Sequence, residues 1–501
     1  MNWKFPLFRA GLVAVCSMLL IVLIPSPYSS KEEEPPESPE LVEWWKEQAD
    51  AAERSNQPDI AAIYKSRLDG YAASLKQPPS LSVNSGSLQP AADSFETARW
   101  FKRSELPSTA KTEPLAKFEP VSGTYLGMLG ADRRVSYDVT KVDDVYGRTH
   151  AMYLAYVGWR KFQTDTNSYF PIRQAERVKQ IGGALQIGWE PRFGLEDVQD
   201  DEYVRTFARE AKASGIPVFL RYASEMNGAW VPWHGNPELY IEKFRLIHKI
   251  MKEEAPNVVM VWSPNFAPAN NIEEYYPGDD YVDWVGFSLY ATPLSNGKEQ
   301  LKGSLIDTFA PLYAKYSHKP IMISEGAVAH TVLTTETAYL PWAEGQLSYM
   351  YAVLPRIYPK VKAITYFNFS RAQAVRNKME YVYDLGENPL TDALYKRLIR
   401  SDWYLDSVAE AKTPPDYTYL PVQPETVGAG SHRLLFHGEL ASGNVPFAVE
   451  LSRGDRRLDI SYQMPWEMTL DAAEGSTAKE PLKITAYNEK MEPVAVHTWA
   501  K

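Results

Sequence analysis

The sequence predicts an α/β protein built on a (β/α)8 barrel. Between residue 121 and about residue 405, eight short apolar runs alternate with stretches of helix-like composition. Eight strands that alternate with helices over about 285 residues have the order and size of such a barrel. The alternative is an open doubly wound sheet, but the glycine-rich phosphate-binding fingerprint of that fold is absent after the first predicted strand. We therefore expect a barrel over residues 121–410.

The predicted strands are short apolar runs that are bounded by turn residues or by polar helical segments. They are Gly123–Gly130, His150–Trp159, Gly183–Glu190, Pro217–Ser224, Val258–Pro264, Val282–Tyr290, Pro320–Glu325 and Ala363–Phe369. The segments between them, such as Asp200–Ser214, Pro237–Glu254 and Trp342–Tyr358, have the composition of helices.

The first 30 residues are predicted to be a signal peptide or a membrane anchor. Lys4 and Arg9 precede an apolar run from Ala10 to Ile24. A run of this length suits a signal peptide and is short for a membrane span of about 20 residues. No clean small-residue cleavage site follows it, so we favour an uncleaved anchor over residues 10–28 and keep secretion as the alternative. In either case the rest of the chain is expected outside the cytoplasm.

Residues 31–120 are predicted to hold a linker, short helices and a connector. Residues 31–40 are charged and Pro-rich, which is typical of a linker. Residues 41–76 carry apolar residues at helical spacing and predict one or two helices. Residues 77–119 are rich in Pro, Ser and Ala without a sustained period, so we expect an irregular connector.

The C-terminal end is predicted to be a small all-β module. Residues 411–430 form a predicted linker, and residues 431–501 form the module. Its expected strands are His432–Gly438, Val445–Leu451, Leu458–Gln463 and Ile484–Asn488, with Gly-Asp and Ser-Gly-Asn turns between them. Both a structural role and a carbohydrate-binding role are compatible with this pattern.

Composition excludes several classes of protein. The 501 residues carry 53 basic and 63 acidic side chains, for a net charge of −10. This balance argues against a nucleic-acid partner, which requires a basic surface. Cys16 is the only cysteine, so an internal disulfide and a cysteine-rich metal site are excluded.

Two glutamates stand where predicted strands end. Glu225 follows the fourth strand and Glu325 ends the seventh. Barrel enzymes carry their working groups at the carboxyl ends of the strands, so both carboxylates are expected at one mouth. A pair of this kind is what retaining glycoside hydrolysis needs: one protonated acid and one ionised nucleophile. The alternative is two surface glutamates in turns. By strand alternation, Arg221 and Ala223 are expected on the same side as Glu225.

The segments around these positions resemble glycoside hydrolase family 26, over roughly residues 120–405. RYASEMNGAW, residues 221–230, is similar to the acid/base motif of that family, R-x-x-H-E-M-N-G-x-W. VWSPN, residues 261–265, resembles its strand-five motif, and KPI at 319–321 followed by Glu325-Gly326 resembles its nucleophile motif. Trp189-Glu190-Pro191 resembles the glucanase-like branch of the family.

The resemblance implies a retaining mechanism that needs no metal or cofactor. It assigns Glu225 as the general acid/base and Glu325 as the nucleophile, and Tyr290 as a hydrogen-bond donor to that nucleophile. The polymers it implies are β-mannans, β-glucans or β-xylans. Two positions depart from the family pattern: Ser224 replaces a histidine and Ser288 replaces an aspartate. These departures put the mannan specificity in doubt.

Further residues are candidate sugar contacts. The predicted substrate-binding residues are Arg221, Trp189, Trp230, Trp233, Asn265 and Tyr290. Indole rings can stack on the C–H face of a pyranose, although each tryptophan could also belong to the core. Asn227 is expected to shape the turn after the acid/base. Weaker candidates are His150, Tyr153, Trp159, Tyr366 and Asn368.

We therefore predict a retaining hydrolase that cleaves internal β-linkages of a polysaccharide, which is its expected partner. It would be tethered to the membrane or secreted, and the sequence does not predict an oligomeric state. One alternative is a catalytically degenerate barrel that binds cell-envelope polysaccharide. Another is a structural envelope protein that finds its partner through the helices of residues 41–76.

Overall fold

The computed structural model describes residues 39–76, 93–107, 114–162, 164–408, 414–472 and 480–499. The predicted anchor over residues 10–28 lies outside these residues, as do most of the charged linker and residues 77–92 of the predicted connector. Within the described ranges, no helix is long and apolar enough to cross a membrane.

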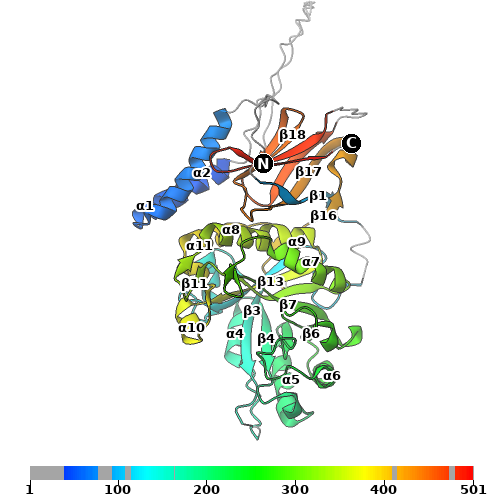
Figure 1. Ribbon diagram of the computed structural model, residues 1–501. Coiled ribbons are helices and arrows are strands. Elements are labelled where there is room, and N and C mark those ends of the chain that lie inside the picture. Colours follow the sequence, from blue (N-terminus) through cyan, green and yellow to red (C-terminus); the bar gives the residue numbers. More distant parts are fainter. Residues whose placement is uncertain are drawn as a thin grey trace, which may run out of the picture. The chain divides into compact units, whose positions relative to one another are not determined.

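Eight parallel strands form a closed barrel, which confirms the predicted fold class (Figure 1). Each strand pairs with its neighbour in chain order, and the last pairs with the first from Ala363 opposite Tyr125 to Phe369 opposite Ala131. The strands are β2 (Thr124–Ala131), β3 (Met152–Gly158), β4 (Ala184–Glu190), β5 (Val218–Tyr222), β6 (Val258–Trp262), β7 (Trp284–Ala291), β10 (Ile321–Val328) and β13 (Val361–Phe369). All eight coincide with a predicted run. A short strand, β15 (Tyr404–Leu405), adds to the start of β2.

Helices follow most strands and cover the outside of the barrel (Figure 1). They include α4 (Ile172–Gln180), α5 (Glu202–Ser214), α6 (Pro237–Glu254), α7 (Leu305–Tyr316), α8 (Leu340–Ser348), α9 (Leu354–Ile357) and α11 (Pro389–Leu398). Local sequence determines where several of them begin. Asp201 caps α5 by accepting a hydrogen bond from the Val204 amide, and Asn236 caps α6 in the same way, with Pro237 in the first turn.

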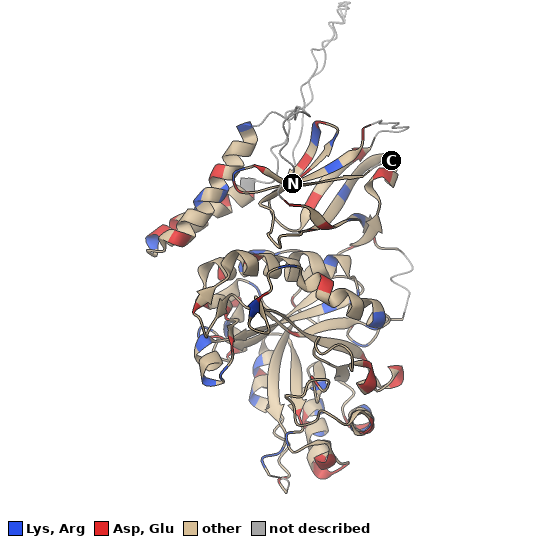
Figure 2. Ribbon diagram, in the orientation of Figure 1, with Lys and Arg blue, Asp and Glu red and all other residues tan. Residues whose placement is uncertain are grey.

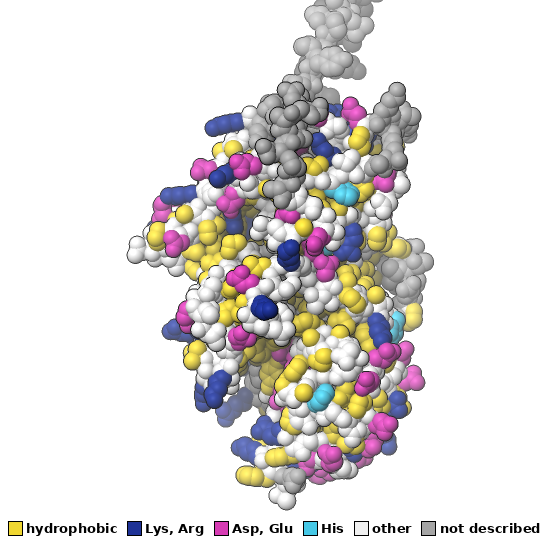
Figure 3. Space-filling view, viewed as in Figure 1, with side chains coloured by type: hydrophobic (Ala, Val, Ile, Leu, Met, Phe, Trp, Pro, Cys, Tyr) yellow, Lys and Arg dark blue, Asp and Glu magenta, His cyan; other side chains and the backbone are white. Residues whose placement is uncertain are grey.

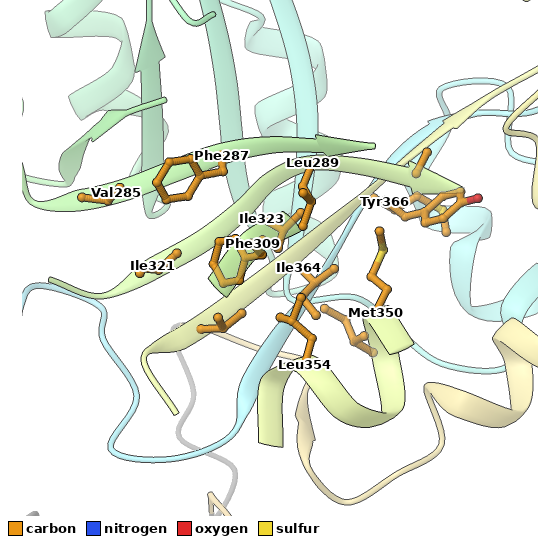
Figure 4. Close-up of a cluster of buried hydrophobic side chains, with 14 of the residues drawn as sticks. Val285, Phe287, Leu289, Phe309, Ile321, Ile323, Met350, Leu354, Ile364 and Tyr366 are labelled. Atoms are coloured by element: carbon orange, nitrogen blue, oxygen red, sulfur yellow. The ribbon is translucent and has the colours of Figure 1, made fainter. Parts of the chain in front are cut away.

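The pleat of the strands sorts side chains between two cores. Val285, Phe287 and Leu289 of β7 point outward, toward Phe309 of α7 (Figure 4). Alternate residues point inward and stack in layers. The inner layer near the amino ends of the strands is apolar: Met152, Ala184, Phe219, Val259, Val261, Trp284, Met322 and Ala363. The next layer is polar and holds Arg221, Gln186, Ser263, Ser288, Ser324 and Thr365, all buried. This polar layer supports the carboxyl-terminal mouth.

The prediction of an irregular connector is wrong for residues 95–105, because these residues form a strand. β1 (Phe95–Glu105) pairs antiparallel with β16 (Tyr417–Val422) and β17 (Gly430–Leu440), so part of the predicted linker 411–430 is also a strand. Only Trp100 and Phe101 of β1 are buried. Because these two residues are adjacent, β1 lacks the alternation of apolar and polar residues that predicts a strand. The strand is stabilised instead by backbone pairing with segments more than 300 residues away, as the register from Trp100 to Val422 illustrates.

The C-terminal module consists of two four-stranded antiparallel sheets. One has the order β16-β1-β17-β20, and the other has the order β19-β18-β21-β22. The remaining strands are β18 (Ala448–Arg453), β19 (Arg456–Ser461), β20 (Trp466–Ala472), β21 (Leu482–Tyr487) and β22 (Pro493–Trp499). Prediction missed β20 and β22. Because β1 precedes the barrel in the chain, the module is assembled from both sides of the barrel sequence.

Two helices precede β1, in agreement with the helical periodicity of residues 41–76. They are α1 (Pro39–Arg54) and α2 (Pro58–Lys76). Trp45 of α1 stacks on Phe447 of the module, with ring centroids 5.9 Å apart. Acidic and basic residues are interspersed along these two helices (Figure 2). On the face drawn in Figure 3, Lys and Arg side chains are likewise dispersed among acidic and neutral ones.

A cluster of acidic groups joins the module to α7 and predicts a pH effect on stability. Ser304, the N-cap of α7, donates to Glu439 of β17 at 2.5 Å. Burial, a hydrogen bond to Glu439 and the charge of Glu439 raise the pKa of Asp307 to about 6, while His437 and Arg99 oppose the shift. A carboxyl whose pKa is raised in the folded state destabilises that state once it ionises, so this cost grows between about pH 4 and pH 6.

We expect Asp307→Asn to raise the free energy of unfolding by about 1 kcal/mol at pH 7.5, a figure discounted because Asp307 is partly exposed. The amide removes the charge and can still donate to Glu439. Thermal unfolding should show a gain at pH 7.5 and none at pH 4. Asp280→Asn, an exposed position, is the control. An equal gain at both pH values would contradict this account.

Candidate active site

Glu225 reaches the barrel mouth through a turn that follows β5. The strand ends at Tyr222, and Ala223 and Glu225 adopt left-handed backbone conformations with φ of 47° and 59°. The expectation that strand alternation extends from Arg221 to Glu225 is therefore wrong, because the pleat stops before Ala223. The Glu225 amide donates to the Ser263 carbonyl at 2.8 Å, which ties the turn to the end of β6. Such conformations in residues other than glycine are costly and concentrate at functional sites.

The Glu225 carboxylate is held by three side chains, those of Trp230, Asn265 and Ser288. The indole Nε1 of Trp230 donates to Oε2 at 2.7 Å, and Asn265 Nδ2 donates to Oε1 at 2.9 Å. Burial raises the pKa of Glu225 above its ordinary range, and the charge of Glu325 raises it further. Hydrogen bonds from Ser288, Trp230 and Asn265 oppose that rise. The net upward shift favours a protonated carboxyl, as a general acid requires.

Glu325 lies at a bulge in β10, where the pairing register with β7 shifts between Ile323 and Glu325. Its side chain accepts three hydrogen bonds. Arg221 Nη1 donates to Oε2 at 3.0 Å, the Tyr156 hydroxyl donates to the same oxygen, and the Tyr290 hydroxyl donates to Oε1. These donors fix the orientation of the carboxylate.

Arg221 is fully buried beneath this carboxylate. Its Nε donates to Ser263 at 3.1 Å and its Nη2 donates to Ser288 at 3.3 Å. Ser288 also bonds Glu225. The serine that replaces the family's aspartate therefore links Glu225 to the arginine that bonds Glu325. The structure thus places Arg221 under the pair and Tyr290 in contact with Glu325.

A cavity of about 530 Å³ opens above these groups. Both Glu225 and Glu325 line it, together with aromatic and aliphatic side chains from β2, β3 and β13, such as Leu129, Leu154 and Phe367. This concave site therefore brings together an acid with a raised pKa and a fixed carboxylate.

The predicted tryptophan platforms have three different positions. Trp189 is fully buried and stacks on Phe207 of α5 at 3.9 Å, so its prediction as a sugar platform is wrong. Side chains of β4 alternate between the two faces of the strand, and Trp189 lies on the face that is directed toward the helices. Trp233 lines the cavity and donates to the Ser224 carbonyl at 2.8 Å. Trp230 is 58% exposed beside Glu225, as a sugar platform would be.

The other predicted residues support the site without lining the cavity. Asn227 is buried in the turn after Glu225 and donates to the carbonyls of Asn265 and Pro268 at 2.9 Å. His150 bonds the Tyr395 hydroxyl at 2.7 Å, and burial lowers its pKa to about 4. The weaker candidates Tyr153, Trp159, Tyr366 and Asn368 are likewise buried in contacts with other side chains or with the backbone.

Among the cavity residues that the sequence prediction missed are Tyr156 and Glu190. Both lie close to the ends of predicted strands, so the argument that selected Glu225 and Glu325 could have found them. Inward-facing alternation gives the missing signal: Met152, Leu154 and Tyr156 share one side of β3, and Ala184 and Glu190 share one side of β4.

Tyr156 depends on a glycine in the neighbouring strand. A side chain at Gly188 would place its Cβ 2.7 Å from the Tyr156 ring, so the ring occupies the space that the glycine leaves. For the predicted hydrolysis of a polysaccharide, we expect Tyr156→Phe to lower kcat by about 10- to 100-fold with little change in KM. The reason is that one hydrogen-bond donor to Glu325 is lost.

Gly188→Ala should reproduce that loss by displacing the ring. Steady-state kinetics of both variants test the pair, with Tyr137→Phe, an exposed cavity-rim residue bonded to Gln373, as the control. Full activity in Tyr156→Phe would show that Arg221 and Tyr290 suffice.

Comparison with known proteins places this site in a family. Residues 199–333, which span Glu225 and Glu325, match the family model of glycosyl hydrolase family 26. This match confirms the predicted resemblance to that family over the segment that carries both glutamates. Endoglucanase H of Acetivibrio thermocellus is 29% identical over 229 residues, which cover 42% of this chain and 24% of that protein. β-1,3-Xylanase TXYA of a Vibrio species is 30% identical over 153 residues, 29% of this chain and 31% of that protein.

The chain thus spans a third or less of the length of these two relatives. Among solved structures, a modular endo-β-1,4-mannanase from Cellulomonas fimi aligns with a TM-score of 0.44 and 18% identity, over 74% of this chain and 92% of that one.

Proposed function

We propose that the protein is a retaining endo-β-glycanase. One observation carries the proposal: a protonatable Glu225 and an arginine-bonded Glu325 face one cavity at the carboxyl ends of the barrel strands. This is the pair of roles that double displacement requires. The match of residues 199–333 to glycosyl hydrolase family 26 supports the same assignment.

In the first step, Glu325 attacks the anomeric carbon while Glu225 transfers its proton to the departing glycosidic oxygen. A covalent glycosyl ester on Glu325 results, and the leaving chain departs as an alcohol. In the second step, Glu225 removes a proton from water, whose oxygen attacks the anomeric carbon and releases Glu325. Arg221, Tyr156 and Tyr290 keep Glu325 oriented, both as the nucleophile of the first step and as the leaving group of the second.

The proposed substrate is a β-linked polysaccharide. The names of the relatives, an endoglucanase and a β-1,3-xylanase, support a β-linked backbone, and Ser224 and Ser288 in place of the family's histidine and aspartate argue against a standard mannanase. We further propose that the protein acts outside the cytoplasm, tethered through residues 10–28 or secreted. An exopolysaccharide of the producing cell would then be within reach.

The decisive test is release of reducing ends from glucomannan, galactomannan, mixed-linkage β-glucan, xylan and the cell's own exopolysaccharide. We expect hydrolysis of at least one polymer, with retention of anomeric configuration when the product is followed by NMR. Inversion would overturn the mechanism. Binding without hydrolysis of any polymer would favour the alternative, a degenerate barrel that holds envelope polysaccharide.

A further inference from the structure

A third carboxylate, that of Glu190, lies in the catalytic cavity and has no part in the mechanism above. Glu190 is the last residue of β4 and lines the cavity with Glu225 and Glu325. The alternation that turns Trp189 toward the helices turns Glu190 inward. Its backbone carbonyl is engaged, because it accepts from the Trp159 amide at 2.8 Å. Within the described residues, no donor contacts its carboxylate oxygens.

The charged side chains that line the cavity are all acidic. Its lining includes three glutamates and, within the described part of the chain, neither lysine nor arginine. Two arginines lie near it. Arg221 is buried beneath the cavity, where Glu325 already engages it. Arg192 is exposed on the turn after β4, with its guanidinium packed against Gly158.

Burial raises the pKa of Glu190, and the nearby charge of Glu325 adds to the rise, while Arg221 and Arg192 oppose it. An ionised Glu190 is therefore short of partners until a ligand supplies them. Sugar hydroxyls are donors that can do so, since a carboxylate offers four acceptor positions. A carboxylate on the sugar would instead meet the like charges of Glu190 and Glu325 in a partly desolvated site.

We propose that Glu190 is a specificity-determining residue that accepts hydrogen bonds from hydroxyl groups of an uncharged sugar and excludes polysaccharides bearing carboxylate groups. The proposal rests on the proposed function and narrows it to a substrate class: neutral β-linked polymers are taken, and uronate-containing polymers are rejected. Glu190 acts on the choice of sugar, whereas the chemical step belongs to Glu225 and Glu325.

The test compares matched polymers that differ only in charge. Glucomannan and mixed-linkage β-glucan are each used unmodified and partly oxidised at C6, which converts primary hydroxyls to carboxylates. The wild type should favour the unmodified form by at least about 10-fold in kcat/KM. Glu190→Gln keeps the size of the side chain and removes its charge, so the preference should fall several-fold, through a gain on the oxidised polymer.

Glu196→Gln is the matched control. It removes one negative charge from an exposed position six residues further along the same loop and should leave the preference unchanged. An unchanged preference in Glu190→Gln, with hydrolysis of the unmodified polymer intact, would overturn the inference and leave the proposed function standing. An equal change in Glu196→Gln would assign the effect to overall charge, which also overturns it.

A binding measurement makes the test independent of hydrolysis. In affinity electrophoresis, the full-length protein migrates through gels that contain either form of each polymer. We expect the wild type to be retarded by the unmodified polymers alone, and Glu190→Gln to be retarded by both forms. This pattern without hydrolysis would overturn the proposed function and support the role of Glu190. Retardation by neither form, or equally by both forms in the wild type, would overturn the inference.

Discussion

Glu325→Ala is expected to lower kcat for every substrate by about 10⁴-fold or more. The loss should not depend on the leaving group, because no covalent ester can form without the nucleophile. Arg221 and both tyrosines would remain, aimed at an empty position. Reducing-end assays on the polymer and on an aryl glycoside measure the effect.

Two further results would identify Glu325 as the nucleophile rather than a structural residue. Azide should restore activity to Glu325→Ala on an activated aryl β-glycoside and give the α-glycosyl azide, since the anion attacks in place of the carboxylate. A 2-deoxy-2-fluoro glycoside should label the peptide that contains Glu325 in the wild type. Labelling of Glu190 instead would show that the wrong carboxylate has been assigned.

Glu225→Ala is expected to depend strongly on the leaving group. Polysaccharide hydrolysis should fall by about 10²- to 10⁴-fold, because the departing alcohol needs a proton. An aryl glycoside with an acidic phenol needs none, so its glycosylation step should be nearly normal. The comparison of the two substrates separates loss of the acid from loss of the fold. Equal losses on both would contradict the acid role.

The role of Glu225 as an acid also predicts the direction in which kcat/KM changes with pH. Glu225 must be protonated for the first step, so kcat/KM on the polymer should fall as the pH rises through its pKa. Burial and the charge of Glu325 place that alkaline limb above the ordinary range of a glutamate. Trp230→Phe removes a hydrogen bond that lowers this pKa, so the limb should move to higher pH. In Glu225→Ala the limb should vanish on the aryl substrate.

The sequence by itself determined the barrel and the pair of glutamates at its mouth. Periodicity is a local property, so alternating apolar runs and helical segments identify strands and helices wherever they recur. The rule that parallel strands end at one face then brings Glu225 and Glu325 together from positions 100 residues apart, and both line the cavity.

Tertiary structure decided which neighbours of that pair face the sugar. Trp189 and Glu190 are adjacent in sequence, yet the pleat of β4 buries one against α5 and directs the other into the cavity. Glu225 departs from the pleat altogether, because its turn is anchored to Ser263 of β6. β1 became a strand through pairing with β16 and β17, and no local pattern predicts that pairing. Local periodicity specifies elements, whereas side-chain direction at strand ends and distant pairing depend on contacts formed only when the chain is folded.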